Sequence, residues 1–173
     1  EDNVLIVAGP GAGKTELLAQ KACYLLQTNK CLAPKKILAI SLKKDSADNL
    51  QKRVEKRCGK DLSNRFVSMT YDAFAKSIFD RFRKGLPEEY LPDLDYSIAI
   101  KDDISVKGAF EKFGYKQKDF IMNKVLGNIK LPLKNQSDYE KVWKMLIKGN
   151  GSDVMSTLNF QMISRLTEYI LQK

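Results

Sequence analysis

Residues 8–15 read A-G-P-G-A-G-K-T and lie between an apolar run and a segment with helical periodicity. The apolar run, V-L-I-V-A at residues 4–8, has the continuous hydrophobic character of a strand buried on both faces. In residues 14–27, three apolar side chains recur at helical spacing. A glycine-rich octapeptide ending in Lys-Thr in this setting fits the P-loop pattern, with Ala8 where the first glycine is usually written. These residues are therefore predicted to form a strand, a phosphate-binding loop and a helix.

Each residue type in this loop has a role in holding phosphate. Small residues let the backbone approach phosphate oxygens, so the amides of residues 11–14 can point at them, and the following helix adds its positive end. The Lys14 ammonium is expected to contact the β- and γ-phosphates and the Thr15 hydroxyl to bind Mg²⁺, which makes these two the candidate catalytic residues. The alternative is a glycine-rich turn without a ligand. The residues predicted to bind a nucleoside triphosphate are Ala8, Gly9, Pro10, Gly11, Ala12, Gly13, Lys14, Thr15 and Glu16.

Strand and helix patterns alternate through the first half of the chain. Short apolar runs at residues 37–40 and 66–69 have strand character. Each precedes a segment with apolar residues at helical spacing, at residues 43–57 and 71–83. Together with the strand and helix around the loop, this alternation indicates an α/β fold with a parallel sheet and helices on its faces.

The pattern changes after residue 83, where Gly85, Pro87 and Pro92 interrupt the chain. Beyond this interruption, apolar residues recur at helical spacing. The expected helices cover residues 106–113, 118–129, 137–148 and 158–171. The second half is therefore predicted to be an all-helical unit joined to the α/β core.

The net charge of +9 is unevenly distributed. Residues 30–60 carry ten basic and three acidic side chains, whereas residues 86–105 carry one basic and six acidic side chains. The basic block favours an anionic partner, above all nucleic acid. The alternative is a solvated, lysine-rich helix face.

Several classes of protein are excluded by the composition. The chain has no histidine, which removes Ser-His-Asp and Cys-His catalysis and every histidine-ligated metal site. Cys23, Cys31 and Cys58 are odd in number without C-x-x-C spacing, so reduced thiols are predicted rather than a disulfide framework or a zinc site. No apolar run approaches the roughly 18 residues of a membrane span, and residues 1–3 lead into the apolar run without a secretory signal. We expect a cytoplasmic protein with no membrane partner.

Three segments beyond the loop carry a family resemblance. Residues 37–54 read I-L-A-I-S-L-K-K-D-S-A-D-N-L-Q-K-R-V and resemble motif Ia of the UvrD/Rep/PcrA superfamily 1 helicases. Residues 70–74, T-Y-D-A-F, are similar to the T-F-H-x-F segment of that family, and residues 158–162, L-N-F-Q-M, to its D-F-x-x-L helix start. The order and spacing of these segments match the family along nearly the whole chain.

The resemblance implies an incomplete RecA-like P-loop NTPase sheet that uses ATP and Mg²⁺. Residues 1–84 would be the N-terminal part of the ATP-binding core, residues 85–157 a helical insertion, and residues 158–173 the helix that returns to the core. The parent would be an ATP-dependent helicase that moves 3′ to 5′ on single-stranded DNA. The DNA-binding residues implied by the matching segments are Ser41, Leu42, Lys43, Lys44, Thr70, Tyr71 and Asp72.

The sequence departs from the family pattern at three positions. Leu42 replaces an aromatic residue that can stack on a DNA base, and Asp72 replaces a histidine. Glu16 stands where many relatives have an arginine that packs on adenine. These changes predict weaker contacts with DNA bases and adenine. Tyr71 has two interpretations, a base-stacking residue or an aromatic packed on the core.

No D-E-x-Q-D segment follows Leu158, so the acidic Mg²⁺ ligand and the water-activating glutamate of the family are not in this sequence. The expected partner for turnover is the remainder of the helicase, with a second RecA-like domain and its arginine finger. These residues alone are therefore expected not to hydrolyse ATP at a useful rate. The alternatives are a nucleotide or small-molecule kinase built on the same loop, and a non-catalytic nucleic-acid-binding module.

Overall fold

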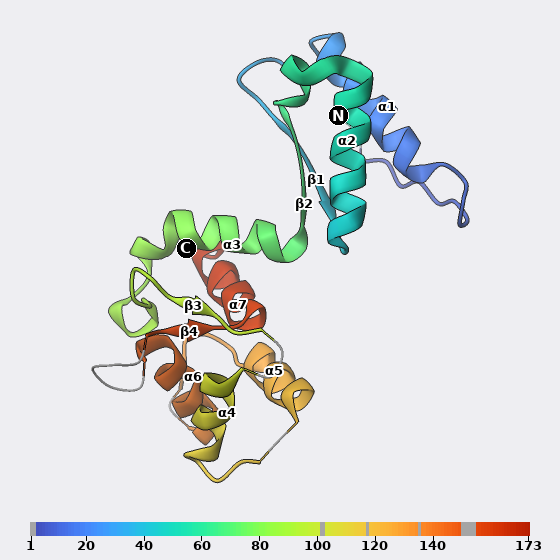
Figure 1. Cartoon of the computed structure of the whole chain (residues 1–173). Helices are drawn as coiled ribbons and strands as arrows, with labels where there is room; N and C mark the ends of the chain where they lie inside the picture. The colour runs from blue at the N-terminus through green and yellow to red at the C-terminus, as the bar shows by residue number, and fades with distance from the viewer. Residues whose placement is uncertain (1–2, 101–102, 117, 135, 150–154) are drawn as a thin grey trace. The chain divides into compact units, whose positions relative to one another are not determined.

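The computed structural model describes residues 3–100, 103–116, 118–134, 136–149 and 155–173. The chain divides into two compact units, and the boundary falls between Phe74 and Ala75 (Figure 1). Each unit has its own cluster of buried apolar side chains. The finer division predicted from the sequence, with limits at residues 84 and 157, stays a prediction.

The first unit contains a parallel pair of strands. Its elements are α1 (Lys14–Gln27), β1 (Ile37–Ser41), α2 (Lys44–Ser63) and β2 (Phe66–Thr70). The strands pair in register, with Ile37 opposite Phe66 and Ser41 opposite Thr70. Parallel strands need a crossover connection, which α2 supplies. The predicted strands at residues 37–40 and 66–69 and the α/β pattern of this unit are confirmed.

Both helices of the first unit lie on the same side of the strand pair (Figure 1). The side chains buried between these layers are Ala19, Ala22, Cys23, Leu26, Leu50, Val54 and Phe66. The β1 side chains alternate in their burial, so Leu38 and Ile40 face away from the helices and are nearly half exposed. Near its end α2 is kinked at Gly59, whose φ of 81° is in the left-handed region that favours glycine.

Residues 4–8 do not form the buried strand predicted from their apolar run. They have no regular secondary structure, and Val4, Leu5 and Val7 are 79%, 89% and 86% exposed. A strand buried on both faces requires a hydrogen-bonded neighbour and a layer on each side. Within the described residues these two requirements are not met for this segment, so the prediction is wrong here.

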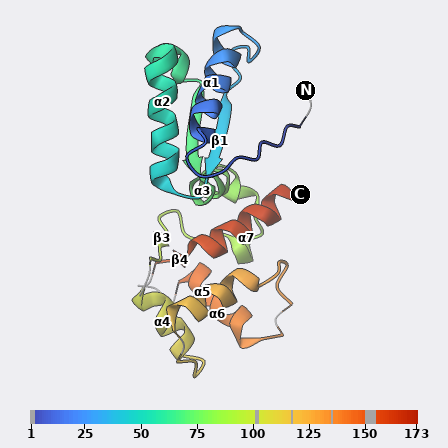
Figure 2. The same cartoon turned by 90° about the vertical axis from the view of Figure 1, so that its right-hand side faces the viewer.

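The second unit is mainly helical. α3 (Tyr71–Phe82) leads into it, followed by the short 3₁₀ helices η1 (Arg83–Gly85) and η2 (Glu88–Tyr90). The longer helices gather side by side (Figure 2) and confirm the four helices predicted for this half. They are α4 (Ile104–Glu111), α5 (Asp119–Asn128), α6 (Asp138–Lys148) and α7 (Phe160–Leu171).

The all-helical prediction is corrected by a short pair of strands. β3 (Ser97–Ile98) pairs in parallel with β4 (Thr157–Leu158). Leu158, expected at the start of the last helix, is therefore in a strand, and Asn159 caps α7 by accepting from the Met162 amide at 2.8 Å. Strands of two residues are too short for an alternating pattern, and their partners lie far apart in sequence. The pairing was therefore not visible in local periodicity.

Candidate functional site

The phosphate loop, residues 8–15, has the backbone that its glycines allow. Gly11 and Gly13 both have φ of 76°, in the left-handed region that non-glycine residues rarely adopt. A Cβ built on either glycine would meet nothing within 4 Å, so the need for glycine comes from the backbone angle rather than from space. Gly13 is the N-cap of α1 and makes no side-chain capping bond. The amides of residues 14–16, which precede the first intrahelical hydrogen bond from the Leu17 amide to the Gly13 carbonyl, can thus point at an external acceptor.

Lys14 is hydrogen-bonded to its own loop. Its ammonium donates to the carbonyl oxygens of Ala8 and Gly9, each at 2.6 Å. The Ala12 amide also donates to the Gly9 carbonyl, at 3.3 Å, which closes the turn between them. These contacts place the cationic group against the loop that is predicted to hold phosphate.

Thr15 lies exposed in the first turn of α1, next to Lys14. Its hydroxyl is the type of oxygen ligand that Mg²⁺ accepts. Among the described residues, no three Asp, Glu, Cys or His side chains come together as a metal cage.

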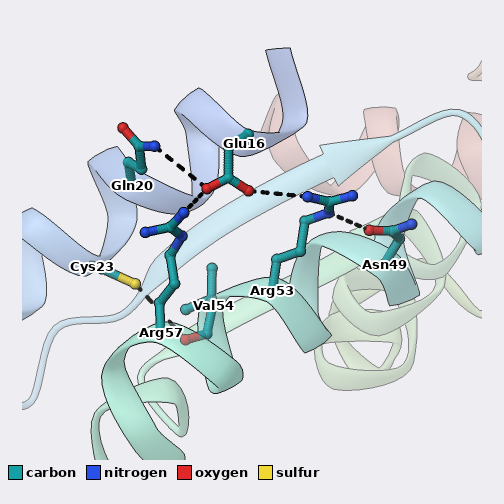
Figure 3. Close-up of polar contacts among 7 residues, drawn as sticks. All are labelled: Glu16, Gln20, Cys23, Asn49, Arg53, Val54 and Arg57. Carbon is teal, nitrogen blue, oxygen red and sulfur yellow. Dashed lines mark hydrogen bonds and ion pairs between the residues drawn. The ribbon is translucent and has the colours of Figure 1, made fainter. Parts of the chain in front are cut away.

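Glu16 is held by two arginines of α2 (Figure 3). Its Oε2 accepts from Arg53 Nη1 at 3.0 Å, and its Oε1 accepts from Arg57 Nη2. Gln20, one turn along α1, lies 3.4 Å from Oε1. Arg53 is also fixed on its own helix, since its Nε donates to Asn49 Oδ1 at 2.6 Å. We call Glu16, Arg53 and Arg57 the Glu16 cluster.

The Glu16 cluster was missed by sequence reasoning. The spacing of Arg53 and Arg57 shows that both lie on one face of a helix. Their partner is 37 and 41 residues away, and only the packing of α1 against α2 brings it into reach. The cluster borders an open groove of about 810 Å³, which is lined by Glu16, Asp45, Asp48, Asn49, Lys52, Arg53, Lys56 and Arg57.

The predicted DNA-binding residues cluster where β1 and β2 end. Ser41 and Thr70 are the last residues of the two strands and lie opposite each other. Lys43 is the N-cap of α2, and Lys44 is its first residue. Both lysines are exposed. This edge combines backbone from two strands with two ammonium groups, a combination suited to phosphate.

The other three predicted DNA-binding residues, Leu42, Tyr71 and Asp72, are exposed. The Leu42 side chain is 95% exposed and that of Tyr71 is 59% exposed, so neither is part of the apolar core. Asp72 lies in the first turn of α3, and the Thr70 hydroxyl accepts from the Ala73 amide at 3.2 Å. Thr70 therefore caps the start of α3 in addition to any contact with DNA.

The chain is similar to known proteins over most of its length. The family described as UvrD/REP helicase N-terminal domain matches residues 1–169. The ATP-dependent DNA helicase PcrA of Staphylococcus epidermidis is 30% identical over 145 residues, 82% of this chain and 19% of that protein. PcrA of Staphylococcus aureus is 29% identical over the same shares. The ATP-dependent DNA helicase srs2 of Schizosaccharomyces pombe is 33% identical over 88 residues, 50% of this chain and 10% of that protein.

The family match covers nearly all of this chain, whereas the chain covers only a small part of each relative. The chain spans about a fifth of the length of the PcrA relatives and a tenth of the srs2 relative. No helix in the described part of the chain is both long and apolar enough to cross a membrane. Because the family match runs through 169 of the 173 residues, the chain belongs to the UvrD/REP helicase family and corresponds to its N-terminal domain.

Proposed function

We propose that this chain is the ATP-binding N-terminal part of an ATP-dependent DNA helicase, with a RecA-like core, that moves 3′ to 5′ on single-stranded DNA. The observation that carries the proposal is the phosphate loop. Two glycines in the left-handed region precede α1, and the Lys14 ammonium lies on the loop carbonyls. Relatives named as ATP-dependent DNA helicases support the same function.

The loop would bind ATP through its triphosphate. The Lys14 ammonium exchanges its bonds to the carbonyls of Ala8 and Gly9 for bonds to the β- and γ-phosphates, which are stronger because both partners are charged. The amides at the start of α1 bind phosphate oxygens alongside it. Thr15 would supply a hydroxyl ligand to Mg²⁺, which neutralises phosphate charge when bound.

Single-stranded DNA would cross the edge where β1 and β2 end. Ligands of parallel α/β sheets bind at the carboxyl ends of the strands, which are Ser41 and Thr70 in this unit. Lys43 and Lys44 attract the DNA backbone from this edge. The exposed ring of Tyr71 is the aromatic surface on which a base can stack.

Turnover is proposed to need the remainder of the helicase. Hydrolysis requires a carboxylate that orients water and positive charge on the far side of the γ-phosphate. Glu16, which follows the loop directly, is already paired with two arginines. We therefore assign the missing groups to residues of the longer helicase, including its second RecA-like domain.

The kinase alternative gains no support from the contacts of Arg165. A kinase lid needs arginines that reach the transferred phosphate. Arg165 is the only arginine after Arg83, and it donates to the Gly127 carbonyl and pairs with Glu168 at 2.6 Å. Its charge therefore serves contacts within the second unit.

Phosphate release measured with saturating single-stranded DNA tests the proposal. The 173-residue chain is expected to bind ATP and DNA without turnover, whereas a longer chain that includes the second motor domain turns ATP over when DNA is added. Phosphoryl transfer by the short chain to a nucleoside monophosphate would instead support a kinase. The proposal would be contradicted if the short chain did not bind ATP, or if it did not bind DNA.

A further inference from the structure

The first turn of α1 is poorly packed although it carries Lys14 and Thr15. The buried side chains of this helix begin at Ala19. Lys14 and Thr15 are exposed, and Leu17 and Leu18 are 44% and 51% exposed. Burial therefore fixes the later turns of α1 and contributes little to the turn that would hold phosphate and metal.

Glu16 connects this turn to α2. Within the described residues, the side-chain bonds that join the first turn of α1 to another helix are those from Arg53 and Arg57 to Glu16 (Figure 3). The arginine-bearing segment of α2 is firmly packed, because Leu50 and Val54 are buried against α1 and the strands. The first turn of α1 is thus held in place relative to α2 through one carboxylate, that of Glu16.

We propose that Glu16 is a positioning residue for the phosphate loop. By holding Glu16, Arg53 and Arg57 fix the first turn of α1 and with it the Lys14 ammonium, the Thr15 hydroxyl and the amides beside them. Glu16 then raises the affinity for a triphosphate without contacting the base. The inference rests on the proposed nucleotide site and adds residues of α2 to the set that controls it.

Charge and positioning predict opposite effects of neutralising Glu16. A carboxylate two residues after Lys14 repels phosphate, so Glu16→Gln should tighten triphosphate binding if the electrostatic field alone matters. If positioning matters, the same change releases the first turn from α2 and weakens binding. Each partly exposed ion pair contributes only a small free energy. The loss of both ion pairs of Glu16 is therefore expected to weaken triphosphate binding by roughly three- to tenfold.

The ligand pair ATP and inorganic tripolyphosphate separates positioning from direct contact. Titration calorimetry with Mg²⁺ would compare wild type with Glu16→Gln and with the double variant Arg53→Gln, Arg57→Gln. Positioning predicts the same fold loss for both ligands, because tripolyphosphate has no base. A loss confined to ATP would show that Glu16 contacts the nucleoside, and tighter binding or no change would overturn the inference.

Two controls complete the experiment. Glu55→Gln makes the same charge change at an exposed site on α2 and is expected to leave binding unchanged. A variant that combines Glu16→Gln with both arginine changes should lose no more than Glu16→Gln alone, since all three residues act through one connection. Additive losses would overturn the inference. The absence of triphosphate binding in wild type would overturn the proposed function, and this inference with it.

Amide exchange gives a readout that needs no ligand. The Leu17 amide donates to the Gly13 carbonyl at 2.9 Å and reports on the first turn of α1. In Glu16→Gln its hydrogen exchange is expected to accelerate roughly three- to tenfold, while the amides of Ala22 and Leu26 exchange as in wild type. Equal protection of Leu17 in both proteins would overturn the positioning role.

Discussion

The Lys14 ammonium donates a hydrogen bond of 2.6 Å to the carbonyl oxygen of Gly9. A second bond of the same length joins it to the carbonyl of Ala8, so the side chain folds back over the loop from which α1 starts. Backbone carbonyls are neutral acceptors, and a triphosphate offers anionic ones that a lysine prefers. The lysine is therefore placed to exchange one set of acceptors for another.

Replacing Lys14 should remove most of the triphosphate affinity. Hydrogen bonds to charged groups contribute about 1.5–3 kcal/mol, so Lys14→Ala is expected to weaken binding of a fluorescent ATP analogue by about 10- to 150-fold. Lys21→Ala is the matched control, since it removes the same charge from an exposed site further along α1. Equal affinity of Lys14→Ala and wild type would contradict the assignment of the loop.

Binding of single-stranded DNA should depend steeply on salt. Each phosphate contact on a single strand contributes about 0.7 to the slope of log affinity against log salt. Lys43→Ala and Lys44→Ala are each expected to weaken binding and to reduce that slope by about 0.7, measured by fluorescence anisotropy. Lys60→Ala, an exposed lysine in the last turn of α2, should leave the slope unchanged. A flat salt response in wild type would contradict a phosphate-binding edge.

The parts of the fold that could be predicted were those with a local pattern. The apolar runs around Ile37 and Phe66 became a parallel pair because α2 could bury Leu50 and Val54 against α1 and the strands. The run at residues 4–8 is also apolar, and yet its residues 4–7 are exposed. Burial depends on neighbouring strands, which the composition of a single segment cannot reveal.

The candidate site also has one part that could be predicted from a local pattern and one part that could not. A loop followed by the helix α1 could be predicted because the motif sets small residues, lysine and threonine at fixed spacing before a helical pattern. The contact between Glu16 and Arg57 was not, because it joins residues 41 apart through the packing of two helices. The comparisons establish the family, whereas the assignment of single residues to ATP, Mg²⁺ and DNA stays a prediction.

Trp143 should report on the second unit. It is the only tryptophan and is fully buried, and its indole donates to the Leu126 carbonyl at 3.2 Å. Its emission is expected to shift to longer wavelength on unfolding in urea.

Replacing Trp143 should destabilise the second unit. Trp143→Ala should lower the free energy of unfolding, measured by circular dichroism, by about 3–5 kcal/mol because of the cavity that the substitution leaves. Phe82→Ala, at a half-exposed aromatic, is the control and should cost less than about 1 kcal/mol. Similar losses in both variants would contradict the placement of Trp143.

Cys23 should react slowly with alkylating reagents, and for a reason that its pH profile identifies. Its side chain is 5% exposed, and its thiol lies 3.7 Å from the Val54 carbonyl, to which the Cys58 thiol also donates at 3.2 Å. Burial, and after it a hydrogen bond and charge repulsion from Cys58, raise the pKa of Cys23 to about 11.

Only the thiolate is alkylated, so a raised pKa keeps Cys23 in its unreactive form through neutral and mildly alkaline pH. Iodoacetamide labelling of a Cys31→Ser protein, followed by mass spectrometry of the Cys23 peptide, should give a rate that still rises between about pH 9 and pH 10.5. The same shift sets the sign of the effect on stability. The unfolded chain releases this proton more readily than the folded one, so the free energy of unfolding should fall as pH increases through that range. Circular dichroism at each pH confirms that the labelled protein is folded, and Cys23→Ala should flatten the decline in stability. A labelling rate that levels off by about pH 9 would show an ordinary thiol that is shielded only by its neighbours.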